Sequence, residues 1–207
     1  MSDRSRQKSP LAIAILAMLT EEPMHAYRMH ELIKDRGKAG VVNVAQRNSV
    51  YQTIERLQRA DLIRVEKTMR AEGRPERVVY AITATGSAAL KQWLKEMLAV
   101  PAAEFPQFPA ALSFVMVLPQ QEARAQLELR VAALEARLHQ TVAALEAIRA
   151  TALPRLFLIE EEYKQALLES ELTWIQSLLD DMRTGEITWN EQWLHQVAAG
   201  FGNPDRT

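Results

Sequence analysis

A cluster of hydrogen-bonding side chains at residues 47–52 offers the clearest chemistry in this sequence. It contains Arg47, Asn48, Ser49 and Gln52, with Tyr51 among them. Arginine can hydrogen-bond guanine, asparagine and glutamine can hydrogen-bond adenine, and a phenol can donate to a phosphate. The cluster therefore predicts a surface that contacts nucleic acid, and the alternative is a solvated helix face with no ligand.

Helical spacing of apolar residues places this cluster on one side of a helix. Val50, Ile54 and Leu57 recur at intervals of four and three, which predicts an amphipathic helix from about Arg47 to Ala60. The opposite face then carries Arg47, Asn48, Gln52, Glu55, Arg56 and Arg59, and the alternative for Tyr51 is a tyrosine of the core. We expect the N-terminal turns to reach bases and Arg56 to contact a phosphate or nothing.

Two segments of alternating apolar and polar residues follow this helix. Residues 62–68 and 77–82 have the period of β-strands, and residues 69–76 between them contain glycine and proline. This pattern predicts a β-hairpin. Arg70, Arg74 and Arg77 occupy or flank its loop, and we expect them to contact phosphates. The alternative is an ordinary charged hairpin.

The order of elements predicts a winged helix-turn-helix domain over residues 10–98. Helices are expected at residues 11–19, 25–36 and 47–60, then the hairpin, then a helix from 84 to about 98 that Thr83 caps. In such a domain the third helix can enter the major groove of DNA. Residues 1–9 form a basic tail. The fold class is mainly α with a small β-hairpin.

The second half of the chain predicts a helical dimerisation domain. Residues 99–109 contain three prolines and are interpreted as a linker, and residues 110–207 favour long helices at about 120–152 and 155–183 and a shorter one at 187–199. Such amphipathic helices cannot bury their apolar stripes alone, so self-association is expected. The residues expected at the dimer interface follow a largely heptad spacing: Leu127, Val131, Leu134, Leu138, Leu156, Ile159, Tyr163, Leu167, Trp174 and Leu178.

The net charge of the chain changes sign close to the expected boundary between the two domains. Residues 1–97 contain 17 Lys and Arg against 11 Asp and Glu, a net charge of +6, whereas residues 98–207 contain 8 against 15, a net charge of −7. The basic half is suited to a polyanion and the acidic half is not. Double-stranded DNA is therefore the expected partner of the first half.

Several other classes of function are excluded. The sequence has no cysteine and no recognisable catalytic or phosphate-binding motif, so we expect neither an enzyme nor a cofactor. His25 and His30 are five positions apart, which does not suit a shared metal, and no metal site is expected. The apolar run 11–19 is too short to span a membrane, so the protein is expected in the cytoplasm without membrane contact. Trp93 and Trp174 are candidates for contact with a small-molecule effector, with core packing as the alternative.

Five stretches, in the correct order, resemble the PadR family of transcriptional regulators. They are EPMHAY (22–27), SVYQTIERL (49–57), DLI (61–63), GRPERVVY (73–80) and AITATG (81–86). Asp61 stands at a position where the family usually has glycine, and aspartate tolerates the left-handed conformation that this position needs. The C-terminal half is similar to that of the longer members in length and helicity.

The resemblance implies a homodimer in which each subunit places one recognition helix and one wing on DNA. It also implies a regulator that represses a nearby gene from a palindromic operator and releases DNA when a small molecule binds. The alternative function is a protein-interaction module that uses the winged helix without specific DNA binding.

Overall fold

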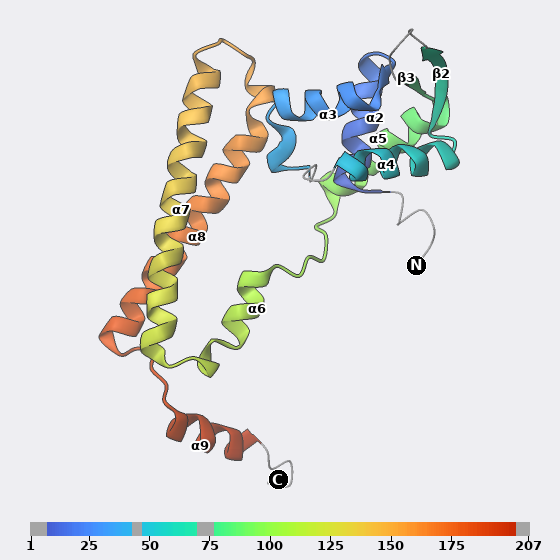
Figure 1. Ribbon diagram of the computed structural model, residues 1–207. Helices are drawn as coiled ribbons and strands as arrows, with labels where there is room; N and C mark the ends of the chain where they lie inside the picture. Colours follow the sequence, from blue (N-terminus) through green and yellow to red (C-terminus); the bar gives the residue numbers. More distant parts are fainter. Residues whose placement is uncertain (1–7, 43–46, 70–76, 202–207) are drawn as a thin grey trace. The chain divides into compact units, whose positions relative to one another are not determined.

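The computed structural model describes residues 8–42, 47–69 and 77–201, and the chain divides into two compact units (Figure 1). The units comprise residues 1–104 and 105–207, so their boundary falls within the proline-containing segment 99–109. The described residues are mainly helical with one small sheet, which confirms the predicted fold class.

Helix α2 (Pro10–Glu21) supplies the centre of the N-terminal unit. Ser9 caps it by accepting a hydrogen bond from the Ala12 amide at 3.2 Å, and Pro10 occupies the first turn, where its missing N–H costs nothing. Ile15 and Leu16 are fully buried, and residues on most of the circumference of α2 are covered. A helix that is apolar all round belongs inside a core, which is the position of α2.

Two further helices pack on α2 and complete the helix-turn-helix. They are α3 (Ala26–Asp35) and α4 (Arg47–Arg59), with a short 3-10 turn, η1 (Lys38–Gly40), after α3. Gly37 follows α3 with a φ of 67°, a left-handed conformation that suits glycine. Met29 and Ile33 of α3 and Ile54 of α4 are buried in the same core as α2.

A three-stranded antiparallel sheet forms the wing. Strand β3 (Arg77–Ile82) lies between β2 (Ile63–Met69) and β1 (Met24–His25). The predicted hairpin is present, with Ile63 opposite Ile82 and an irregularity between Val65 and Lys67. The third strand, β1, is an addition to the prediction, and it ties the start of α3 to the wing through Met24 opposite Tyr80.

The junction between α4, β2 and the last helix of this unit is closely packed. Asp61 ends the turn after α4 with a φ of 56°, as the sequence predicted for this position. Thr83 caps α5 (Ala84–Ala99) by accepting from the Gly86 amide at 2.9 Å, and its hydroxyl donates to the Asp61 carbonyl at 2.7 Å. One threonine therefore fixes the wing, the turn and α5 together.

Two long helices form the core of the C-terminal unit. Helices α7 (Gln120–Arg149) and α8 (Ile159–Thr184) lie side by side in Figure 1, and Leu127, Leu134 and Ile175 are buried between them. The remaining elements are α6 (Gln107–Ser113), η2 (Val115–Val117), η3 (Arg155–Phe157) and α9 (Glu191–Phe201). Gly185, with a φ of 83°, ends α8.

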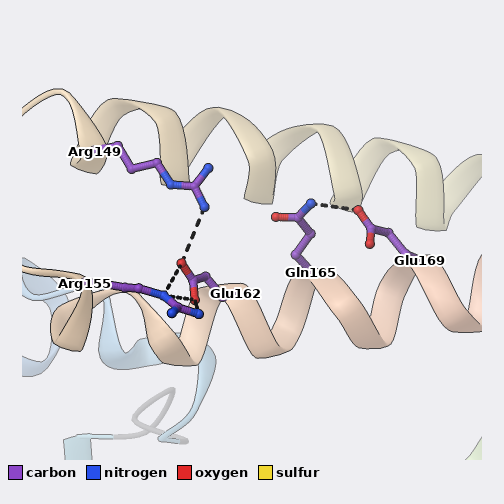
Figure 2. Close-up of polar contacts among 5 residues, drawn as sticks. All are labelled: Arg149, Arg155, Glu162, Gln165 and Glu169. Atoms are coloured by element: carbon purple, nitrogen blue, oxygen red, sulfur yellow. Dashed lines mark hydrogen bonds and ion pairs between the residues drawn. The ribbon is translucent and has the colours of Figure 1, made fainter.

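Figure 2 shows polar contacts where α7 turns into α8. The Glu162 carboxylate accepts from Arg155 Nε at 3.1 Å and from Arg149 Nη2 at 3.5 Å, and Gln165 Nε2 donates to Glu169 at 2.7 Å. The hydrogen bond from Arg155 is the main reason that the pKa of Glu162 lies below its ordinary value. These contacts are exposed, so they orient the turn rather than stabilise the unit strongly.

Among the helices of the described residues, none is both long enough and apolar enough to cross a membrane.

Candidate nucleic-acid interface

Helix α4 exposes one face and buries the other. Val50, Ile54 and Leu57 are at most 1% exposed and fix the helix in the core. Asn48, Tyr51 and Gln52 are exposed on the first two turns, and Ser49 is half-buried beside them. Half of the Tyr51 side chain (51%) is accessible, so the phenol is on the surface rather than in the core. A rigid helix thus presents hydrogen-bonding groups from defined positions.

The predicted arginines differ in their placement. Arg47 begins α4, and Arg77 begins β3 with an exposed side chain. Arg56 is half-buried, and its Nη2 donates to the Ser9 hydroxyl at 3.1 Å, so this guanidinium connects α4 to the cap of α2. Arg70 and Arg74 lie outside the described residues.

A hollow of about 150 Å³ lies where the first turns of α4, the start of α3 and strand β3 meet. Its seven lining residues are His25, Ala26, Tyr27, Tyr51, Arg77, Val78 and Tyr80. Two of the predicted contact residues, Tyr51 and Arg77, therefore line one concave surface, although they are distant in the sequence.

Three residues of this hollow were missed by the sequence analysis. His25 was considered only as a metal ligand, whereas it caps α3: its Nδ1 accepts from the Arg28 amide at 3.0 Å. Tyr27 lies with its ring 6.3 Å from that of His25. Burial, and to a smaller extent the charge of Glu55, raises the pKa of Tyr80 above its ordinary value, so its hydroxyl keeps its proton. The sequence signal for these residues is that they lie in two of the stretches that resemble the PadR family, EPMHAY (22–27) and GRPERVVY (73–80).

The ten residues predicted for dimerisation separate into two groups. Leu127 and Leu134 are buried within the α7–α8 pair of one chain, and Val131, Leu138 and Leu178 are partly buried. The other five are at least half exposed: Leu156 (70%), Ile159 (51%), Tyr163 (66%), Leu167 (52%) and Trp174 (50%). The second group forms an uncovered apolar stripe along η3 and α8.

The two tryptophans predicted for effector contact lie in different units. Trp93 is 9% exposed and belongs to the core around α2. Trp174 is half exposed and contacts Phe108 edge-on, with ring centroids 6.4 Å apart. Arg130 lies over the same Phe108 ring at 3.6 Å from its centroid and hydrogen-bonds Glu171 from Nε at 2.7 Å. The Phe108 ring therefore contacts both Trp174 and the Arg130 guanidinium, which is itself paired with Glu171.

No group of three or more His, Cys, Asp or Glu side chains is placed to hold a metal ion within the part of the chain that the structure describes.

The N-terminal unit has a winged-helix fold with one exposed helix face, and comparison with known proteins relates this unit to a family. Residues 15–92 match the model of the transcriptional regulator PadR-like family. This N-terminal segment, which is less than half of the chain, is therefore similar to that family of transcriptional regulators. A search of curated proteins finds no match.

Solved structures share the fold of both units. Bacillus subtilis PadR in complex with operator DNA has a TM-score of 0.68 at 20% identity, over 83% of this chain and 98% of that one. The same protein with p-coumaric acid has a TM-score of 0.67 at 19% identity, over 84% and 99% of the two chains. The Vibrio cholerae virulence activator AphA has a TM-score of 0.65 at 20% identity, over 84% and 98%. At these identities the likeness establishes the fold.

Proposed function

We propose that this protein is a sequence-specific DNA-binding repressor that acts as a homodimer on a palindromic operator. The observation that carries the proposal is the exposed face of α4, where Asn48, Tyr51 and Gln52 project from a helix that buries its other side. The N-terminal turns of such a helix contact base edges in the major groove, and the wing that begins at Arg77 contacts the backbone. The DNA-bound structure of B. subtilis PadR supports the same use of this fold.

Self-association is supported by the uncovered apolar stripe on η3 and α8. Tyr163, Leu167 and Trp174 are spaced by four and seven residues, so they lie along one side of α8. A contiguous row of half-exposed large apolar side chains marks an interaction surface. A second copy presents the same row, and a two-fold axis through the contact would place two α4 helices on two symmetric half-sites.

Release by a small molecule is the third part of the proposal. Trp174 is half exposed and contacts the Phe108 ring, so the two rings offer an aromatic surface that suits an aromatic effector. Trp93 is buried in the core around α2, which favours the core-packing alternative for this residue. The complex of B. subtilis PadR with p-coumaric acid supports an aromatic acid as the first effector to test.

A gel-shift titration tests the DNA part. The full chain is titrated against the DNA upstream of its own gene, with random DNA as competitor, at two salt concentrations. We expect a shift that resists the competitor and weakens as salt rises, because neutralised phosphates release counterions. A shift that random DNA removes equally well would favour the protein-interaction alternative.

A matched pair of leucine variants tests the dimer. Leu167→Glu introduces a charge into the stripe, whereas Leu129→Glu does so at an exposed leucine of α7 (65%) that does not belong to it. We expect Leu167→Glu to lower the mass measured by light scattering to that of one chain, and Leu129→Glu to keep the dimer mass. A dimer in both variants would refute this interface.

A further inference from the structure

Another hollow lies in the C-terminal unit, between η2 and the start of α9. Its volume is about 260 Å³, close to the lower end of the range in which small-molecule pockets fall. Six apolar and three polar residues line it: Met116, Val117, Leu118, Pro119, Gln120, Trp189, Asn190, Glu191 and Leu194. Two segments that are distant in the sequence thus form one concave and mainly apolar surface.

The apolar wall of this hollow is left open by the described residues. Met116, Val117 and Leu118 are three consecutive large apolar residues, and they are 43%, 79% and 41% exposed. A single exposed apolar residue is common on a protein surface, whereas a contiguous row indicates a binding site. The row borders a concave surface here, so it suits a small molecule that enters the hollow.

Most polar groups around the hollow are already used inside the protein. Gln120 Nε2 donates to the Ile187 carbonyl at 3.1 Å, and Gln120 Oε1 accepts from the Thr188 hydroxyl at 3.0 Å. Trp189 Nε1 donates to the Leu118 carbonyl at 2.9 Å. These bonds hold the segment before α9 against the start of α7. They also orient the Trp189 ring, so one wall of the hollow is formed before a ligand enters.

Glu191 is the only charged residue among the nine that line the hollow. Its side chain is exposed on the first turn of α9, and no hydrogen bond or ion pair joins it to another residue that the structure describes. Asn190 Oδ1, by contrast, accepts from the Trp193 amide at 2.8 Å. The N-terminal end of a helix carries roughly half a positive charge, which offsets only part of the carboxylate charge. The hollow therefore favours a cation over an anion.

We propose that this hollow binds a small organic cation with an apolar body. The body covers Met116, Leu118 and the Trp189 ring, and the cationic group lies next to the Glu191 carboxylate. Burial of apolar surface supplies most of the affinity, whereas the carboxylate and the indole face select the positive charge. This site differs from the Trp174 surface in its residues and in the charge of its ligand. Neither DNA binding nor dimerisation enters this inference, so its failure would leave the proposed function unchanged.

The probe for this site is benzyltrimethylammonium, with phenylacetate and benzyl alcohol as its anionic and neutral counterparts. The full chain is titrated at constant ionic strength, and the indole N–H signals of its four tryptophans are followed by two-dimensional NMR. Trp189→Phe identifies the signal of Trp189. We expect the cation to shift this signal in a saturable way, with a Kd on the order of 1 mM, and the two counterparts to bind more weakly.

A matched pair of charge variants locates the cationic group. Glu191→Gln removes the carboxylate at the hollow, and Glu146→Gln makes the same change at an exposed residue near the other end of α7. We expect Glu191→Gln to weaken binding of the cation about twofold to fivefold, and Glu146→Gln to leave it unchanged. Binding of benzyl alcohol, which has no charge, should be equal in the two variants and the wild type.

Three results would overturn the inference. The first is the absence of a saturable shift of the Trp189 signal with benzyltrimethylammonium. The second is an affinity for the cation that does not exceed that for phenylacetate, or that Glu191→Gln lowers no more than Glu146→Gln, because the carboxylate would then not select the charge. The third is a Trp189 signal that moves with protein concentration in the absence of the probe, because a second copy of the chain would then cover the hollow.

Discussion

The contact between Gly86 and the turn after α4 allows a quantitative prediction about the DNA-binding unit. A Cβ at Gly86 would stand 2.0 Å from the Leu62 carbonyl oxygen, whereas ordinary contact begins at 3.4 Å. That carbonyl accepts from the Thr83 amide at 3.1 Å, and the Thr83 hydroxyl, whose proton is directed to the nearer Asp61 carbonyl at 2.7 Å, lies 3.1 Å from it. The Leu62 carbonyl cannot retreat without weakening the bond from the Thr83 amide, so Gly86→Ala should separate α5 from the start of β2.

The size of the loss follows from three contributions. Overpacking of a closed site costs about 1–3 kcal/mol. One or two weakened hydrogen bonds add about 1 kcal/mol each. The better helix propensity of alanine offsets about 1 kcal/mol. We expect a net loss of about 1–4 kcal/mol in the free energy of unfolding, and each kcal/mol lowers the Tm of a unit of this size by roughly 4–8 °C.

Thermal and urea unfolding followed by circular dichroism measure this loss. Gly200→Ala is the matched control, because the structure leaves open space around a Cβ at Gly200 in α9. We expect the control to keep or slightly raise the stability. A loss below about 0.5 kcal/mol in Gly86→Ala would refute the close packing of α5 against Leu62.

Three further predictions concern single contacts. Asp61→Gly should raise the stability by up to about 1 kcal/mol in urea unfolding, because glycine adopts the left-handed φ of 56° without strain; a destabilised variant would contradict this. The hydrogen bond from Arg36 lowers the pKa of Glu21, so this pair stabilises the folded state above the ordinary carboxyl pKa and ceases to do so as pH falls through the lowered value. Glu21→Gln should therefore lose a few tenths of a kcal/mol at pH 7, and this difference should shrink as pH falls through the lowered pKa; a difference that does not change with pH would exclude the mechanism. Trp189→Phe removes the bond from Nε1 to the Leu118 carbonyl at 2.9 Å, so amide hydrogen exchange near α9 should become faster, and unchanged exchange would show that this bond does not hold the segment.

The fold of the N-terminal unit was predictable because its periodicities are strong and local. Val50, Ile54 and Leu57 fix α4, and the alternation on either side of residues 69–76 fixes the hairpin. Strand β1 was not predictable, since two residues, Met24 and His25, are too few to show a period, and their pairing with β3 depends on tertiary structure.

The partners of the apolar stripes were harder to predict. A heptad pattern indicates that a helix buries one side, but it does not say whether the covering helix belongs to the same chain. Leu127 and Leu134 are covered by α8 of their own chain, whereas Tyr163 and Leu167 remain exposed. Thr141 lies three residues after Leu138, where the heptad spacing would place an apolar residue. It is buried and donates to the Arg137 carbonyl at 3.0 Å, so a polar residue is tolerated there.

The candidate site was predictable where it depends on one helix and not where it depends on the convergence of several elements. Asn48, Tyr51 and Gln52 lie on the exposed face that helical spacing assigned to them. His25 and Tyr80 join Tyr51 only through the pairing of β1 with β3, which brings the start of α3 to the wing. No spacing in the sequence encodes that proximity.

The most direct test of the account is the DNA motif that the protein selects from random duplexes. The wild type should return a two-fold symmetric motif, because two α4 helices contact two half-sites. Asn48→Ala combined with Gln52→Ala should lose the base preference at corresponding positions of both half-sites and keep salt-dependent binding. Recovery of no motif by the wild type, or of the same motif by both proteins, would contradict the claim that α4 determines sequence-specific binding.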